Sequence, residues 1–180
     1  MYKGLKVFLI VLIMTMVIRV PSAIGSADAQ TLTLLGRYIT NTERNLKSAP
    51  LSPKYKVRAI SNFREAKRSI YKGKYSSGVS YLLDVIRLVL EGTKQKLDLA
   101  NECINTNPRR ADETLADLNY LLFVSGEVHF VMGLCLYVIK EDKVASVTFR
   151  TILETYDNRN LLVIHKHSRR YLIKIKRRNY

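Results

Sequence analysis

The stretch YLLFVSGEVHFVMGLCLYVI, residues 120–139, decides how this chain folds. It is apolar on every side of a helix, and Ser125, Glu127 and His129 interrupt it. A helix that is hydrophobic all round is typical of the centre of a soluble bundle, and twenty residues is also the length of a membrane span. Because a Glu, a His and a Ser in mid-span make insertion costly, the stretch predicts a buried core helix.

Glu127 needs a partner in either setting. An unpaired carboxylate in a core is costly, so we expect a basic side chain such as Arg64 or Arg87 beside it. In a membrane span, Glu127 and His129 would instead be functional candidates by default. The nearby Gly126 allows a neighbouring helix to approach closely, as Gly133 does two turns later.

Other segments carry apolar residues at helical spacings of three and four. The first covers residues 30–49, and the second begins at Ser52-Pro53 and ends at Gly73. The third is capped by Ser76 or Ser77, and Asn105-Thr106-Asn107-Pro108 breaks the chain before the helix that contains residues 120–139.

The last segment, residues 147–175, also has mostly helical spacing, with Asn158-Arg159-Asn160 inside it. Strand alternation is confined to the four residues 173–176, which are too few to overrule the longer pattern. The sequence therefore predicts an all-α fold, a bundle of about five helices joined by short loops.

The N-terminus resembles an export signal. Lys3 and Lys6 precede an apolar run, Val7 to Ile18, and small residues end at Ala27-Asp28-Ala29, which is an A-x-A cleavage pattern. We expect cleavage before Gln30; the competing interpretation is a retained anchor. The whole chain has 180 residues, 47% of them hydrophobic. The part that follows residue 29 is long enough to form one domain. The predicted organisation is a signal peptide over residues 1–29 and one all-helical domain over 30–180, with a basic C-terminal helix or tail from about 159.

Cys103 and Cys135 are the only cysteines of the chain. If a helical hairpin turns near Pro108, the two thiols lie tens of Ångströms apart, beyond the reach of a disulfide. We therefore expect no disulfide, but two buried free thiols. A break in the later helix at Gly126 or Gly133 would reverse this expectation.

The stretch IYKGKYSSGVSYLLDV, residues 70–85, resembles the turn and second helix of a tetratricopeptide repeat through Gly73 and Tyr75. The resemblance covers residues 54–90 and implies a protein-binding scaffold. No second copy follows one repeat length later, so it predicts a repeat-like hairpin inside a bundle. Residues that depart from the repeat pattern are Gly78, Val85 and Leu82 in the second helix, and Asn62 and Glu65 in the first.

No phosphate-binding loop, dinucleotide fingerprint, nucleophile elbow or zincin helix occurs in the chain. Ser69 and Lys72 match S-x-x-K, but its companion motifs are absent. His165 and His167 would share a face only on a strand, so they are expected as surface histidines of a helix rather than metal ligands. We expect no catalytic residue, no metal and no cofactor.

The net charge is +15, and it stays strongly positive after removal of residues 1–29. Such a charge favours anionic partners and disfavours self-association by unscreened contact. The charge is concentrated in two patches, whereas residues 106–158 have a net charge of −3. The tail patch comprises Lys166, Arg169, Arg170, Lys174, Lys176, Arg177 and Arg178. The second patch comprises Lys54, Lys56, Arg58, Arg64, Lys67, Arg68, Lys72 and Lys74.

In the tail, Leu172 and Ile175 would lie on one helical face between cations, a pattern typical of helices that bind anionic membranes. The second patch mixes cations with Tyr55, Tyr71 and Tyr75, as binders of single-stranded nucleic acid do, although the rings mostly fall on the apolar face. We therefore predict a non-enzymatic, exported or envelope-anchored interaction module for an acidic lipid surface, envelope polymer or acidic protein. The alternative is a membrane-tethered, cytoplasm-facing nucleic-acid-binding protein.

Overall fold

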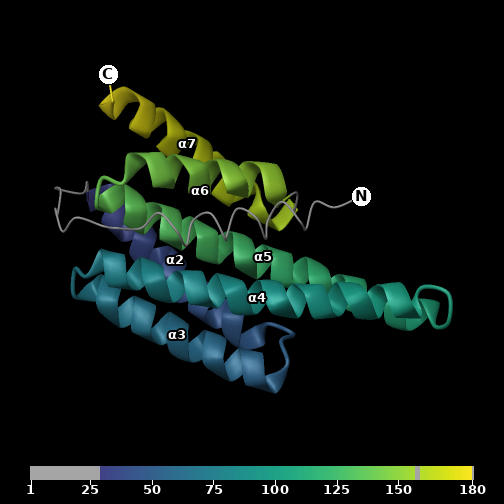
Figure 1. The fold of residues 1–180 in the computed structure, drawn as a ribbon. Coiled ribbons are helices and arrows are strands. Elements are labelled where there is room, and N and C mark those ends of the chain that lie inside the picture. Colours follow the sequence, from purple (N-terminus) through teal and green to yellow (C-terminus); the bar gives the residue numbers. More distant parts are fainter. Residues whose placement is uncertain (1–28, 157–158, 180) are drawn as a thin grey trace.

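A computed structural model describes residues 29–156 and 159–179, and every regular element in these ranges is a helix (Figure 1). The predicted all-α class is confirmed. The predicted export segment lies outside the described residues, except that Ala29 is the first residue of α2. The elements are α2 (Ala29–Ser48), α3 (Pro53–Tyr71), α4 (Tyr75–Cys103), α5 (Pro108–Val138), α6 (Asp142–Thr155), the 3-10 turn η1 (Arg159–Leu161) and α7 (Leu162–Arg178).

The described residues form six α-helices, whereas the sequence predicted about five. The difference arises in the last segment, which is divided between Thr155 and Arg159 into α6 and α7. Apolar spacing continues on both sides of this division, so periodicity does not reveal that the chain reverses there. The third predicted helix also starts earlier than expected, at Tyr75, and Lys74 precedes it in place of a serine cap.

Helix α5 is the centre of the bundle. It packs against α2, α4, α6 and α7, while α3 packs against α4 and α2 on the far side (Figure 1). Among the described residues, α5 is the one helix with the length and composition of a membrane span, and 89% of its most apolar window is buried inside the bundle. The stretch 120–139 is thus a core helix in the structure, as its polar interruptions predicted.

Two glycines of α5 permit close helix contacts, as expected. A Cβ atom at Gly126 would lie 2.7 Å from Leu161 Cδ1, and one at Gly133 would lie 2.7 Å from Phe149 Cε1. Carbon atoms are ordinarily about 3.5–4.0 Å apart at contact, so any side chain at either position would collide with its neighbour. These two contacts bring η1 and α6 directly onto the backbone of α5.

The cysteines follow the prediction: both are buried and unpaired. Cys103 ends α4, whereas Cys135 lies near the end of α5, which continues through Gly126 and Gly133 without a break. The two thiols are therefore held at different places along the α4–α5 pair. Burial raises the pKa of the Cys135 thiol above its ordinary value, so this side chain is an inert thiol of the core.

Gly73 lies just beyond the end of α3 and has a positive φ of 71°, which residues other than glycine adopt only at a cost. We expect Gly73→Ala to reduce the free energy of unfolding by about 1 kcal/mol. Gly36 in α2 is a matched control, since it has open space around its Cα and no positive φ. Gly36→Ala is expected to stabilise the protein by roughly 0.5–1 kcal/mol. Urea denaturation measures the change in the free energy of unfolding for both variants. Changes of the same sign in the two variants would contradict this account of the turn.

Candidate functional site

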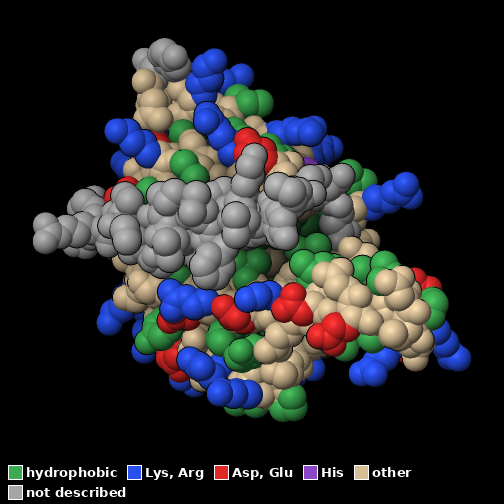
Figure 2. Space-filling model, turned by 45° about the vertical axis from the view of Figure 1, so that its right-hand side comes forward, with side chains coloured by type: hydrophobic (Ala, Val, Ile, Leu, Met, Phe, Trp, Pro, Cys, Tyr) green, Lys and Arg blue, Asp and Glu red, His purple; other side chains and the backbone are tan. Residues whose placement is uncertain are grey.

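Helix α7 presents its cations on the side that faces away from the bundle. The buried residues Ile164, Ser168, Tyr171 and Ile175 recur at intervals of three and four and mark its inner face. The opposite side, called here the outward face of α7, is a mixed basic and apolar surface over the upper part of the molecule (Figure 2). It comprises Leu162, Lys166, Arg169, Arg170, Ile173, Lys176 and Arg177.

The predicted apolar face of the tail is not available to a membrane. Ile175 is 4% exposed and belongs to the core, and Leu172 packs against that core. The prediction that this pair would meet lipid is therefore wrong, because the bundle already covers it. Other apolar side chains stand among the cations instead: Leu162 is 65% exposed and Ile173 is 52% exposed. Arg169, Arg170, Lys176 and Arg177 lie three or four positions from Ile173, so they surround it on the helix surface.

Aromatic packing fixes the orientation of α7. The Tyr171 ring stacks on Phe149 at 5.4 Å between centroids and meets Tyr137 edge-on at 4.9 Å. Its hydroxyl shares a hydrogen bond of 2.8 Å with the hydroxyl of Thr31 in α2. Contacts with α2, α5 and α6 thus hold one side of α7 inward, so the predicted basic helix or tail is a helix docked on the bundle.

Two of the seven predicted anion-binding residues are engaged by the bundle. The Arg178 guanidinium donates to Asp142 at 3.0 Å and to the backbone carbonyl of Tyr137 at 3.3 Å, and it lies over the Tyr137 ring. The Lys174 ammonium lies over the ring of Tyr171 at 5.1 Å. Both side chains therefore help to attach α7, and neither is counted here as part of the anion-binding surface.

The other five, Lys166, Arg169, Arg170, Lys176 and Arg177, are exposed and form no ion pair with another residue in the described ranges. A cation of another helix lies near α7, because Arg37 of α2 is close enough to His167 to affect its pKa. Burial, followed by Arg170, Arg37 and Lys166, lowers the pKa of His167 below its ordinary value of 6.5. Sequence reasoning missed Arg37 because 130 positions separate it from His167 and no local pattern connects them.

The second predicted patch is partly neutralised. Lys67 donates to Glu43 of α2 at 2.7 Å, Arg64 lies 4.0 Å from the same carboxylate, and Arg68 pairs with Glu65 at 2.6 Å. The remaining cations form two groups at the ends of α3, about 20 Å apart by helical rise. They are Lys54, Lys56 and Arg58 at its start, and Lys72 and Lys74 at its end.

The two patches lie on opposite sides of the bundle. Figure 1 shows α7 at the top and α3 at the bottom; α7 packs mainly on α5 and α6, whereas α3 packs mainly on α4. A single flat anionic surface cannot contact both. The α3 side also lacks a stacking platform: Phe63 is buried, Tyr55 and Tyr75 pack against the core, and Tyr71 is the exposed ring. This arrangement is unlike the rows of exposed rings in binders of single-stranded nucleic acid.

Glu127 has a different partner from those predicted. Asn45 of α2 donates a hydrogen bond of 2.8 Å to its carboxylate. Arg64 and Arg87 are instead near Glu43 and Asp84. Burial raises the pKa of Glu127 to about 7, and the hydrogen bond from Asn45 and the charge of Arg44 only partly oppose this effect. The prediction of a basic contact is wrong because α2, rather than α3 or α4, covers this side of α5.

His129 belongs to a buried polar group between α5 and α6. Its Nδ1 atom lies 3.1 Å from the hydroxyl of Tyr156 and 2.9 Å from the carbonyl oxygen of Ser125. The hydroxyls of Tyr156 and Ser125 share a hydrogen bond of 2.8 Å. Burial lowers the pKa of His129 to about 4, so the ring is neutral at pH 7. All three side chains are at most 1% exposed, so they connect two helices and do not face a substrate.

The remaining candidate residues of the sequence do not converge. His165 and His167 lie on the helix α7, where a separation of two positions directs them to different sides. Ser69 and Lys72 lie at the end of α3, and no hydrogen bond joins their side chains among the described residues. Within residues 29–156 and 159–179, no group of three His, Cys, Asp or Glu side chains is placed to hold a metal ion.

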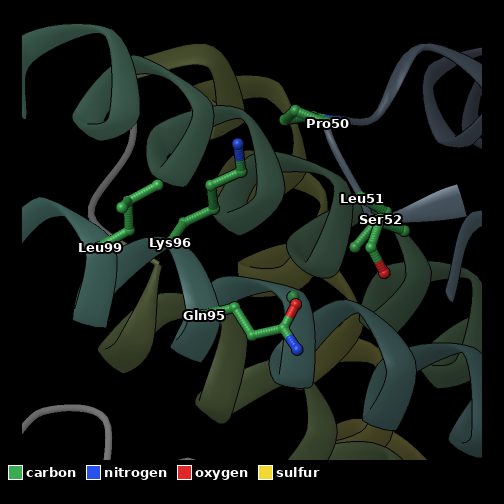
Figure 3. A pocket seen from close by; sticks show the side chains of 7 residues that line it. Pro50, Leu51, Ser52, Gln95, Lys96 and Leu99 are labelled. Atoms are coloured by element: carbon green, nitrogen blue, oxygen red, sulfur yellow. The ribbon is translucent and has the colours of Figure 1, made fainter. Parts of the chain in front are cut away.

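A pocket of about 270 Å³ lies where the loop after α2 meets α4 (Figure 3). Its charged lining residue is Lys96, whose ammonium is paired with Asp117 at 2.5 Å. Figure 3 shows that ammonium directed away from the Gln95 amide. The polar groups therefore do not converge on a common point, and the outward face of α7 is the better candidate site.

The resemblance of residues 54–90 to a tetratricopeptide repeat stays a prediction, although α3 and α4 do form a helical hairpin about the Gly73 turn. Comparison with family models, with curated proteins and with solved structures gives no match for this chain.

Proposed function

We propose that this protein is a non-enzymatic, exported or envelope-anchored helical module that binds an anionic lipid surface through the outward face of α7. The observation that carries the proposal is the set of five exposed cations on one side of a firmly docked helix, with Ile173 among them. The proposed location comes from the sequence of residues 1–29. Envelope polymers and acidic proteins share the same negative charge, and the experiment below separates an envelope polymer from lipid.

Electrostatics supplies most of the proposed affinity. A cation close to anionic headgroups contributes about 1 kcal/mol, and attraction falls off within a Debye length of about 10 Å. Because α7 is held by Tyr171 and Arg178, its cations are presented together on one side. Ile173 and Leu162 add two exposed apolar side chains that fit the boundary between headgroups and acyl chains.

Neutralising the outward face should weaken binding to anionic vesicles by about 10³-fold. The test variant changes Arg169, Arg170, Lys176 and Arg177 to glutamine, which removes four contributions of about 1 kcal/mol each. The matched control changes Lys54, Lys56, Arg58 and Lys72 of α3 to glutamine, so both variants lose the same charge. Co-sedimentation of the full chain with phosphatidylcholine vesicles, with and without phosphatidylserine, measures the affinities. Both variants keep the same N-terminal segment, so any contribution of that segment to vesicle binding cancels when the two affinities are compared.

Equal losses in the two variants would overturn the assignment to α7. Binding that does not depend on phosphatidylserine would overturn the electrostatic mechanism. Heparin and a single-stranded oligonucleotide serve as soluble probes in the same assay. Tight binding of heparin alone would indicate an envelope polymer, whereas an oligonucleotide interaction lost in the α3 variant would favour the cytoplasm-facing alternative.

A further inference from the structure

The α4–α5 pair extends beyond the other helices as a projecting arm, residues 97–119 (Figure 1). α4 and α5 have 29 and 31 residues, against 20 or fewer in each other described helix. Within the arm, the buried residues are the small side chains of the seam between the two helices. These are Ala100, Cys103, Ala111 and Thr114.

One side of the arm is apolar and uncovered. Leu97 of α4 and Ile104, the residue that follows α4, are about two helical turns apart and are 43% and 57% exposed. Leu115 of α5 is 39% exposed. Helical geometry places it on the same side, opposite the Lys96–Asp117 ion pair. Three large exposed apolar side chains on one side of a hairpin mark a surface for interaction.

The arm is also acidic, although the chain as a whole is basic. It carries five acidic residues, Asp98, Glu102, Asp112, Glu113 and Asp117, and two basic ones, Arg109 and Arg110. Asp98 and Asp112 flank the apolar residues, and neither forms an ion pair with another described residue. A complementary partner would be a helix that combines exposed apolar side chains with Lys and Arg.

The outward face of α7 has that chemistry. It offers Leu162 and Ile173 to the apolar side of the arm, and Arg169 and Arg170 to its carboxylates. Figure 1 shows α7 at the top of the molecule and the arm at its right-hand end, so one copy cannot bring its own two surfaces together. We propose that the arm of one copy binds the outward face of α7 of a second copy, which gives a head-to-tail contact.

A head-to-tail contact leaves one unused surface on each partner, so it adds further copies until a ring closes or a chain grows. The net charge of +15 opposes association in general. At about 150 mM salt the Debye length is about 8 Å. The repulsion between distant charges of two copies is therefore screened more than the attraction between opposite charges in contact. The proposed contact between copies uses the outward face of α7, which is also the surface proposed to bind lipid. The contact does not depend on lipid binding.

The test is a charge swap in the full chain, followed by sedimentation equilibrium at about 150 mM salt. The arm variant carries Asp98→Lys and Asp112→Lys, and the α7 variant carries Arg169→Glu and Arg170→Glu. The wild-type protein is expected to associate beyond a dimer as its concentration approaches about 100 µM. Each variant alone is expected to associate at least about tenfold more weakly, because both of its surfaces have the same sign.

Mixing the two variants should restore association to within about threefold of wild type, because each surface then meets one of opposite sign. Monomeric wild-type protein, an unaffected α7 variant, or a mixture that stays dissociated would each overturn the proposal. The arm variant separates this result from the lipid assay, since it should keep its affinity for anionic vesicles. Circular dichroism of each variant checks that these exposed substitutions leave the helices intact.

Discussion

Replacing Phe149 by alanine is expected to lower the free energy of unfolding by about 3–5 kcal/mol, the usual cost of removing a fully buried phenylalanine. The Phe149 side chain is completely buried at the junction of three helices. It contacts the bare backbone of α5 at Gly133, stacks on Tyr171 of α7, and lies 5.9 Å from Phe130 between ring centroids.

Denaturation in guanidinium chloride, followed by far-ultraviolet circular dichroism, measures the effect. Val147→Ala is the control, since Val147 lies two residues away on the exposed side of α6 and should change stability by less than about 0.5 kcal/mol. A cost below about 1 kcal/mol for Phe149→Ala would contradict the packing of α6 and α7 on α5. The same result would weaken the proposed binding surface, because Phe149 and Tyr171 fix which side of α7 faces outward.

The second large effect is a dependence of stability on pH through Glu127. Burial raises the pKa of its carboxyl from the ordinary 4.5 to about 7. Between these values, the folded protein holds a proton that the unfolded chain has released. The contribution of Glu127 to stability is therefore greatest below about pH 4.5 and is lost as the pH rises through about 7. At 1.36 kcal/mol per pKa unit, the loss is about 3 kcal/mol.

Glu127→Gln should remove this dependence, because its amide does not ionise and its oxygen still accepts a hydrogen bond from Asn45. The variant is expected to match wild type near pH 4.5 and to exceed its stability at pH 8 by up to about 3 kcal/mol. Urea denaturation of both proteins across this range gives the difference, in which the other titrating groups cancel. Glu102→Gln, at an exposed carboxyl, is the control. A difference that does not change with pH would contradict the raised pKa.

Local sequence signals predicted much of the fold. The polar interruptions of residues 120–139 identified a core helix, Ser52-Pro53 and Gly73 limited α3, and Asn107-Pro108 began α5. These signals work because helix ends and buried faces depend on neighbours within a few residues. The division of the last segment into α6 and α7 was not predicted, because apolar spacing is the same on both sides of the reversal.

The sequence predicted less well which residues from different helices contact each other. Glu127 was expected beside an arginine, yet Asn45 meets it, because α2 rather than α3 or α4 covers that side of α5. The same reasoning identified the cations of residues 166–178 but gave the wrong role to Leu172 and Ile175, which pack inward. A helical period shows which residues share a face, and it does not show what covers that face.

The sequence by itself predicted the all-helical class seen in the described residues, favoured a buried core helix over a membrane span for residues 120–139, and showed that positive charge gathers at residues 159–180. These properties follow from composition and from spacing along single helices. The tertiary structure decided which cations of α7 face outward, that Arg37 of α2 lies near His167 of α7, and that Arg178 binds Asp142. The reason is physical: each of these outcomes depends on contacts between residues tens of positions apart, which only the packing of whole helices brings together.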